Sequence, residues 1–520
     1  MRAGAFGMCA DMADAAAERA SAGRLLSGTI WNALGRGLPL LLALALTPVL
    51  VHQMGIERWG LFTLALSLVG VFGVFDLGLG AALTRALSAR IGAGEQAGAA
   101  DLAGAAMTAL VLVGAAVAAL ASLGVPFLVT RLLNTPPALQ AEAVAAFRLL
   151  CLAVPLVVLN AALWGALAAY QRFRAANLVS IPVAAFYYIG PVITLWLWES
   201  LVGVVLVLLA ARLANTVCYA WLARRDLPGL GGRLPRLSLV GPLVRMGGWM
   251  SASGILTQAL LYADRFLIGA VLTLSAVAFY ATPLDLVMRM WILPVAVAQT
   301  LLPAMASAYR AHPAVTAGLL RRGALMMMAS VLPFCLVLVG LGPEVLRLWL
   351  GAEFAAGGGR VLQILSVGIF FSCLSFAPGA LLDAIGRPDV NAKWQLAQAA
   401  LFLPLSALGL WLMGIEGAAL AWAARCATDA AGRLFFASRL YPEAAPAARA
   451  IGWPMLAAGG GLLAMLAAGG WTALGLVFGV ALLGFAIAGW FALTVQERRD
   501  AKGLVRRPWR LRAVLRGEPA

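Results

Sequence analysis

Charged residues are scarce in this chain. Only 12% of its 520 residues are Asp, Glu, Lys or Arg, whereas 63% are hydrophobic and the mean hydropathy is +0.93. A soluble domain carries about 25% charged residues, so the composition excludes an ordinary soluble protein and indicates an integral membrane protein. The net charge of +16 does not indicate nucleic-acid binding, because Lys and Arg collect in the cytoplasmic loops of membrane proteins.

Residues that bind metals or form disulfides are also few. The chain has two histidines and six cysteines, and the cysteines are scattered without a CxxC pair. Most lie inside apolar segments, where cysteine is typically a small buried apolar residue and not a ligand. We therefore expect no metal site and no cofactor.

Long apolar segments are what the chain has instead. Fourteen of them approach or exceed the roughly 20 residues that a helix needs to cross hydrocarbon. They are residues 27–51, 58–80, 102–132, 143–169, 176–198, 200–223, 242–270, 275–306, 318–341, 361–384, 390–413, 415–440, 450–471 and 472–495. The sequence therefore predicts an all-α membrane protein with about fourteen transmembrane helices.

The distribution of basic residues predicts the orientation. Counted together with the adjoining ends of the spans, the two termini and the loops after even-numbered spans hold 27 Lys and Arg, and the loops after odd-numbered spans hold five. Since Lys and Arg favour the cytoplasmic side, both termini are expected in the cytoplasm. Residues 1–26 carry charges and no early apolar run, so we expect a cytoplasmic tail and no cleaved signal peptide.

An internal repeat divides the spans. At one constant offset along the chain, four pairs match: Gly55 and Gly269, Gly165 and Gly379, Asn177 and Asn391, and Gly203 and Gly417; Arg212 and Arg425 fall one residue out of register. Two parallel copies of a six-helix unit are typical of an alternating-access transporter. The predicted organisation is an N-lobe (27–223), a basic linker (224–241), a C-lobe (242–440), two further spans (450–495) and a basic tail (496–520).

Four stretches resemble a known family. Residues 31–80 read WNALGRGLPLLLALALTPVLVHQMGIERWGLFTLALSLVGVFGVFDLGLG, 262–282 read YADRFLIGAVLTLSAVAFYAT, and 379–396 read GALLDAIGRPDVNAKWQL, followed by GIEGAALAWAARC at 414–426. They resemble bacterial polysaccharide-biosynthesis membrane proteins, the O-antigen-type oligosaccharide flippases of the multidrug, oligosaccharidyl-lipid and polysaccharide exporter superfamily. The resemblance implies two six-helix lobes around a central cavity.

Charges inside the spans are the candidate site residues, because an intramembrane charge is costly and usually faces a bundle interior or a wet cavity. Arginine suits a diphosphate, since it stays charged and donates bidentate hydrogen bonds. The candidate contacts to a diphosphate or glycan are Arg36, Arg212, Arg289 and Arg425, and the candidate coupling or gating residues are Asp76, Asp264, Asp285 and Asp429. For Asp264 the role in coupling is what the resemblance implies.

Structural interpretations stand beside these. Arg36 can snorkel to headgroups, and Asp76 can cap a helix or pair with Arg85. Asp285 and Arg289 are four residues apart and can form a fixed pair on one helix face, as can Arg425 and Asp429. Asp383 can pair with Arg387 in the same way.

The leading hypothesis is a flippase that moves undecaprenyl-diphosphate-linked oligosaccharide to the periplasmic leaflet, coupled to H⁺ or Na⁺. The alternatives are a cation-coupled multidrug antiporter of the same superfamily and a lipid II-type flippase. Arginines at least equal the acids within the spans, which favours an anionic substrate. An enzyme is disfavoured because no extramembrane loop is long enough for an acceptor site; the longest outer loop expected is 342–360. Membrane lipids, and polysaccharide polymerases or glycosyltransferases, are the expected partners.

Overall fold

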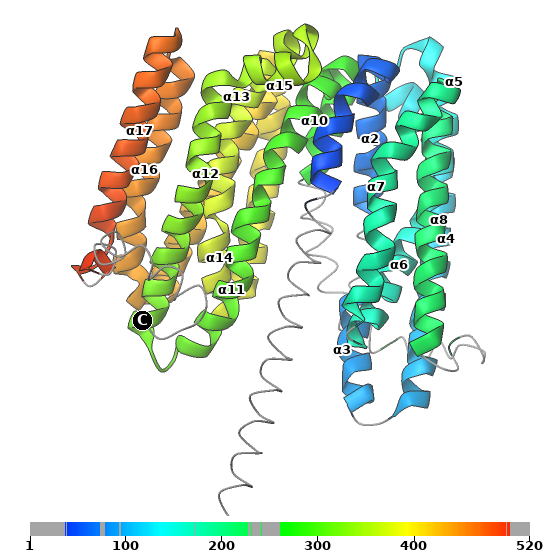
Figure 1. The fold of residues 1–520 in the computed structure, drawn as a ribbon, viewed down its shortest axis with the longest axis horizontal. Helices are drawn as coiled ribbons and strands as arrows, with labels where there is room; N and C mark the ends of the chain where they lie inside the picture. Colours follow the sequence, from blue (N-terminus) through cyan, green and yellow to red (C-terminus); the bar gives the residue numbers. More distant parts are fainter. Residues whose placement is uncertain are drawn as a thin grey trace, which may run out of the picture. The chain divides into compact units, whose positions relative to one another are not determined.

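A computed structural model describes residues 37, 39–72, 79–92, 95–170, 172–226, 230, 241, 261–495 and 497–499. Every regular element in these residues is a helix, as the sequence predicts (Figure 1). The chain divides into two compact units, Met1–Ala278 and Phe279–Ala520.

The first helix described in the N-terminal unit is apolar and covers Pro39–Met54. It continues with α2 (Ile56–Phe72), α3 (Leu79–Gly92), α4 (Gln96–Phe127), a short π-helix (Leu128–Leu132), α5 (Pro137–Cys151), α6 (Ala153–Ala169), α7 (Phe173–Leu197) and α8 (Leu201–Asp226). A further helix covers residues 261–271. The helix α6 packs against α3, α4 and α8, and α8 also packs against α7.

The helix α10 (Leu274–Met288) starts in the N-terminal unit and ends in the C-terminal one. The C-terminal unit then has a 3-10 turn (Arg289–Trp291), α11 (Ile292–Ala308), α12 (Pro313–Leu350), α13 (Ala352–Leu374), α14 (Phe376–Ala384), α15 (Pro388–Leu440), a second 3-10 turn (Pro442–Ala444), α16 (Ala445–Ala467) and α17 (Trp471–Ala492). The hairpin of α16 and α17 packs on α12.

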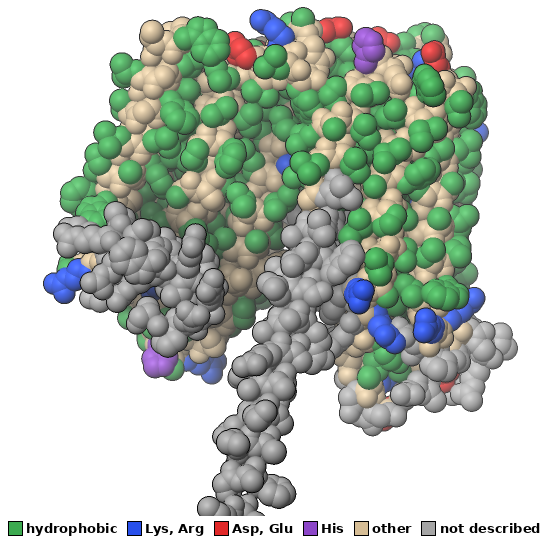
Figure 2. Space-filling model, in the orientation of Figure 1, with side chains coloured by type: hydrophobic (Ala, Val, Ile, Leu, Met, Phe, Trp, Pro, Cys, Tyr) green, Lys and Arg blue, Asp and Glu red, His purple; other side chains and the backbone are tan. Residues whose placement is uncertain are grey.

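Large apolar side chains cover the outside of these helices (Figure 2). Leu348 is 90% exposed, Trp196 84% and Trp411 78%. A helix that is apolar on all sides belongs either in a protein core or in a membrane, and exposed apolar faces select the membrane. Ten of the described helices are long and apolar enough to span it. The chain is therefore a multi-pass membrane protein, although the count of fourteen spans is not confirmed.

Close helix packing in the N-terminal unit depends on small residues. A Cβ at Gly165 of α6 would collide with the carbonyl oxygen of Gly80 on α3. The hydroxyl of Thr84 donates to the Gly165 carbonyl at 3.1 Å across the same contact. Small residues that let helix backbones approach, with a hydroxyl bonding across them, are typical of helix pairs in membranes.

The break between the two predicted spans at 390–413 and 415–440 is confirmed. Helix α15 runs through both, but Gly414 within it has φ 62° and ψ −145°. A residue with a side chain is strained in that conformation, so glycine ends the first half and starts the second. Two other expectations are wrong. Residues 342–360 form no loop: α12 has a kink at Leu341, the predicted end of span 318–341, but stays helical to Leu350, and α13 starts after Gly351. Leu79–Gly92 is helical, although most of it lies in the connection expected between the spans 58–80 and 102–132.

The end of α17 is fixed to the start of α12. Glu497 accepts from Arg321 at 2.8 Å and lies 3.1 Å from Nε of Arg322. Burial alone would raise the pKa of the Glu497 carboxyl, but the hydrogen bonds from Arg321 and Thr494 outweigh burial and lower this pKa. The last two predicted spans, 450–471 and 472–495, leave room only for a tight turn, and such a turn is present at Ala468–Gly470.

Candidate functional site

The eight candidate site residues fall into three groups. Arg36 and Asp76 lie outside the described residues. Arg212 and Asp264 belong to the N-terminal unit. The other four, Asp285, Arg289, Arg425 and Asp429, belong to the C-terminal unit.

Arg212 lies near the middle of α8, which runs from Leu201 to Asp226. Its guanidinium carbon lies 5.5 Å from the ring centroid of Tyr187 on the neighbouring helix α7. The side chain is half-buried. This is a cation–π contact, and such contacts are strongest where water is excluded.

Arg425 repeats this arrangement in the C-terminal unit. It lies near the middle of the second half of α15, and its guanidinium carbon is 5.2 Å from the ring centroid of Phe402 on the first half. The separation of Arg212 and Arg425 along the chain differs by one residue from the offset of the internal repeat, and so does the separation of Tyr187 and Phe402. Both copies of the repeat therefore stack the arginine of their last helix on an aromatic ring of the helix before it.

Neither stacked arginine forms an ion pair with a carboxylate of the described residues. The Nε of Arg425 is buried and has no hydrogen-bond partner there, and one Nη lies 3.9 Å from the sulfur of Cys426. The Tyr187 hydroxyl accepts a hydrogen bond from Arg212, and the remaining N–H donors of the two guanidinium groups can bind a ligand. Each repeat can thus offer a positive charge and bidentate donors to an anion at mid-helix depth.

The predicted pair between Arg425 and Asp429 is wrong. Asp429 instead accepts from Nε of Arg433 at 2.9 Å, one turn further along α15. The count of basic residues assigned Arg433 to the cytoplasmic side of the predicted span 415–440, but its side chain is only 14% exposed. The spacing of four residues was correct, but the arginine partner of Asp429 lies four residues after it along the helix and not four residues before it.

A short polar network extends from that pair. An Nη of Arg433 donates to Oδ1 of Asn391 at 3.4 Å, and Nδ2 of Asn391 donates to Asp383 at 2.8 Å. The same amide donates to the carbonyl of Gly379 at 3.1 Å. The expected pair of Asp383 with Arg387 is therefore wrong. Arg387 bonds Asp389 at the start of α15, and this hydrogen bond lowers the pKa of Asp389 to about 2.

Asp264 and Arg265 are both buried, at 1% and 4% exposure. The Arg265 guanidinium donates to Ser67 of α2 at 3.2 Å and lies over the ring of Tyr262. That ring fills the space beside Gly70 of α2. The described part of predicted span 7 therefore packs on α2 within the N-terminal unit. Sequence reasoning singled out Asp264 and missed the role of Arg265 as the contact to α2.

Asp285 is half-buried in α10 and Arg289 is exposed in the 3-10 turn that follows it. The helix changes its geometry between the two residues. A direct Asp285–Arg289 pair and its opening by substrate or protons remain predictions.

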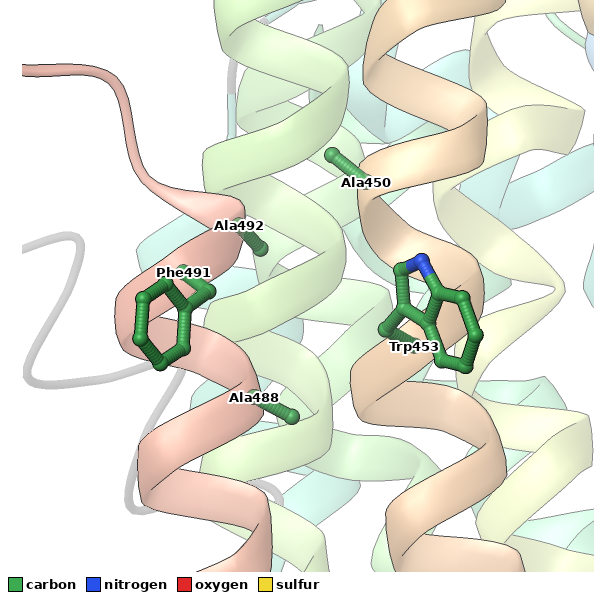
Figure 3. A pocket seen from close by; sticks show the side chains of 5 residues that line it. All are labelled: Ala450, Trp453, Ala488, Phe491 and Ala492. Atoms are coloured by element: carbon green, nitrogen blue, oxygen red, sulfur yellow. The ribbon is translucent and has the colours of Figure 1, made fainter.

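One hollow in the C-terminal unit lies in the α16–α17 hairpin (Figure 3). It has a volume of about 360 Å³ and is lined by Ala450 and Trp453 of α16 and Ala488, Phe491 and Ala492 of α17. No charged group lines it. A lining of this kind suits hydrocarbon and offers nothing to a sugar or a diphosphate.

Comparison with known sequences gives a family. The sequence profile of the family described as "Polysaccharide biosynthesis protein" matches residues 25–309. The chain is also 25% identical over 412 residues to a Shigella flexneri protein named "Putative O-antigen transporter". This alignment covers 78% of the chain and 96% of the relative.

Comparison with solved structures gives the fold. A multidrug resistance MATE family transporter of the MOP superfamily, in its inward-facing conformation, superimposes with a TM-score of 0.69 at 15% identity, over 80% of this chain and 94% of that one. The lipid II flippase MurJ, in an inward closed conformation, superimposes with a TM-score of 0.67 at 12% identity, over 89% and 98%. The fold is that of these transporters, and the expected resemblance is confirmed.

Proposed function

The chain belongs to the polysaccharide biosynthesis protein family, and on that premise we propose that it moves a lipid-linked oligosaccharide across the bacterial inner membrane. The proposed substrate is undecaprenyl-diphosphate-linked glycan, carried from the cytoplasmic to the periplasmic leaflet by alternating access. Both termini lie in the cytoplasm in this proposal, because 27 basic residues lie on their side and five on the other. The process moves the substrate and makes or breaks no covalent bond.

The stacked arginines carry this proposal. Arg212 and Arg425 each place a positive charge near mid-helix, with an aromatic ring beneath it and no carboxylate partner in the described part of the chain. The diphosphate is the anionic part of a lipid-linked glycan, and its oxygens match the donors of a guanidinium. Arg36 and Arg289 are further proposed contacts to the diphosphate or glycan.

A cation-coupled multidrug antiporter is the second candidate, and the fold does not separate the two. The MATE transporter and MurJ superimpose almost equally well on this chain. The stacked arginines favour the flippase, because they would repel an amphipathic cation. A lipid II-type flippase keeps the anionic diphosphate and differs in the glycan, so it stays open beside the leading proposal.

Coupling to H⁺ or Na⁺ is proposed to use the carboxylates inside the helices. Asp264 and Asp429 are 1% and 8% exposed, and Asp76 and Asp285 are the other candidates. Buried ionisable residues in membrane helices are costly and often mark ion or proton paths. The ion pair of Asp429 with Arg433 must open if Asp429 takes up a proton.

A reconstituted flipping assay tests the function. Vesicles that contain the full chain receive undecaprenyl-diphosphate-linked glycan in the outer leaflet, and a membrane-impermeant glycosidase then digests whatever remains outside. We expect protein-dependent protection of the glycan, faster with a proton gradient of the right direction. Gradient-driven export of a cationic dye, with no protein-dependent protection of any lipid-linked glycan, would select the antiporter instead.

A further inference from the structure

A second hollow lies on the N-terminal unit, away from the Arg212–Tyr187 contact. It has a volume of about 320 Å³, and residues of α4, α6 and α8, with Leu230, line it. Met107 and Leu163 lie at its buried side, whereas Val111 and Leu112 are 37% and 56% exposed at the outer face of α4. The hollow therefore opens between helices toward the surface that faces the membrane.

The lining suits an acyl chain. Apart from Thr108 and Arg224 its side chains are apolar, and the hydroxyl of Thr108 already donates to the carbonyl of Gly104. A Cβ built on Gly104 meets no atom within 4 Å, so the missing side chain of this glycine adds to the hollow. An apolar space of this kind excludes ordered water and accepts hydrocarbon.

One end of the hollow is basic. Arg224 lines it and is exposed in the last turn of α8. Arg174, in the first turn of α7, is also exposed, and both belong to the loops that the basic-residue count places in the cytoplasm. Figure 2 shows arginine side chains along the corresponding end of this unit, below its apolar surface. A guanidinium at the headgroup end of an apolar slot complements a lipid with a negative headgroup.

We propose that this hollow is a binding site for an anionic phospholipid of the cytoplasmic leaflet. One acyl chain lies between α4, α6 and α8, and the lipid phosphate accepts hydrogen bonds from Arg224. Basic pockets between helices on the cytoplasmic side bind anionic headgroups in this way. The bound lipid ties the end of α8 to Leu230, which packs on the same apolar cluster as Met107 and Leu163. This site does not depend on which substrate the protein moves.

Native mass spectrometry of the purified full chain tests the proposal, with dioleoyl-phosphatidylglycerol and dioleoyl-phosphatidylcholine as probes. We expect the anionic lipid to bind about fivefold more tightly than the phosphatidylcholine, because one arginine near the headgroup contributes about 1 kcal/mol. Gly104→Leu fills the slot and should weaken binding of both lipids. Arg224→Gln should remove the preference for the anionic lipid.

Matched variants make the result specific. Gly124→Leu adds the same side chain to an open, exposed position of α4 outside the hollow. Arg131→Gln removes an exposed charge from the π-helix that follows α4, also outside the hollow. Both should bind like the wild type. Val111→Trp fills the hollow from its exposed side if Gly104→Leu does not fold. Equal binding of the two lipids by the wild type, or unchanged binding in both filling variants, would overturn the proposal.

Discussion

The energetics of single residues single out Arg212 and Arg425. A charged side chain at the centre of a bilayer costs about 3 kcal/mol or more. A cation–π contact returns about 1 to 2 kcal/mol when it is desolvated, so the aromatic rings of Tyr187 and Phe402 offset only part of that cost. Water or an anion must supply the rest. A permanent ion pair could offset the remaining cost without any role in transport. The described residues provide no such pair for these two side chains.

Replacing these arginines should therefore affect transport. Arg212→Gln and Arg425→Gln each remove charged donors to the substrate, and a hydrogen bond to a charged group contributes about 1.5 to 3 kcal/mol. We expect a loss of at least about tenfold in flipping rate, and a smaller loss for the Lys variants, which keep the charge. The rate of glycan protection in vesicles measures it. Arg347→Gln removes an exposed arginine at the end of α12 and should leave the rate unchanged.

The ion pair of Asp429 with Arg433 leads to a prediction about stability. Their side chains are 11% and 14% exposed, so removal of one partner leaves the other charge poorly solvated. Asp429→Asn should lower the free energy of unfolding by about 3 kcal/mol, with a lower Tm in detergent. The double variant Asp429→Asn, Arg433→Gln should recover part of the loss. A wild-type Tm for Asp429→Asn would show that the pair contributes nothing.

An exposed carboxylate of the same α15 serves as the control for that measurement. Asp389 bonds Arg387 and Lys393, and its pKa is lowered to about 2 by the hydrogen bond from Arg387. Because this cluster is exposed, solvent screens it. Asp389→Asn should leave the Tm at neutral pH unchanged.

At the scale of elements, the sequence was informative where a helix is continuously apolar. The helices α4, α7, α8, α16 and α17 lie at the predicted segments, and Gly414 is the break between two of them. Prediction failed where segments expected to be loops form helices. The arginine-bearing α3 is helical, and the chain after the kink at Leu341 stays helical in α12 and α13 apart from Gly351, because hydropathy finds the hydrocarbon boundary and not the helix end.

The candidate site shows the same division. Spacing placed Arg212 and Arg425 inside helices, but no local pattern could reveal Tyr187 and Phe402 as the rings beneath them, since those contacts join different helices. The constant offset between the two copies of the internal repeat was the one available signal. Arg433 was missed because the count of basic residues assigned it to the cytoplasmic side together with the loop residues.

The contact between α12 and the chain beyond α17 gives a pH prediction. The pKa of Glu497 is lower in the folded protein, so its ion pairs stabilise the fold above the unfolded pKa and are lost as the pH falls below about 4.5. Glu497→Gln should increase hydrogen exchange of residues 490–495 about fivefold at pH 7, as expected for about 1 kcal/mol from a partly exposed pair. Protection factors of the wild type and the variant should converge in acid.

Glu443→Gln is the control for this exchange measurement. It removes an exposed carboxylate of the same unit, before α16, and should leave the protection of residues 490–495 unchanged. Equal protection of the wild type and Glu497→Gln at pH 7 would mean that Arg321 and Arg322 do not hold the end of α17.

At the scale of the whole molecule, the fold alone admits two chemistries. The same architecture is found in a multidrug transporter and in a lipid II flippase, so the charge inside the helices has to decide between cationic and anionic cargo. Both sequence repeats contribute one stacked arginine, and the family and the Shigella relative are consistent with a glycan substrate. Each copy of the repeat thus supplies one arginine that is proposed to bind the anionic headgroup.

Binding of undecaprenyl diphosphate, compared with undecaprenol, to the purified protein tests this claim most directly. The two lipids share the polyprenyl chain and differ in the anionic headgroup that the stacked arginines are proposed to bind. We predict that the wild type binds the diphosphate at least about tenfold more tightly, equivalent to about 1.4 kcal/mol. This preference should disappear in the double variant Arg212→Gln, Arg425→Gln. Equal affinity of the wild type for the two lipids, or a preference that survives in the double variant, would contradict the account.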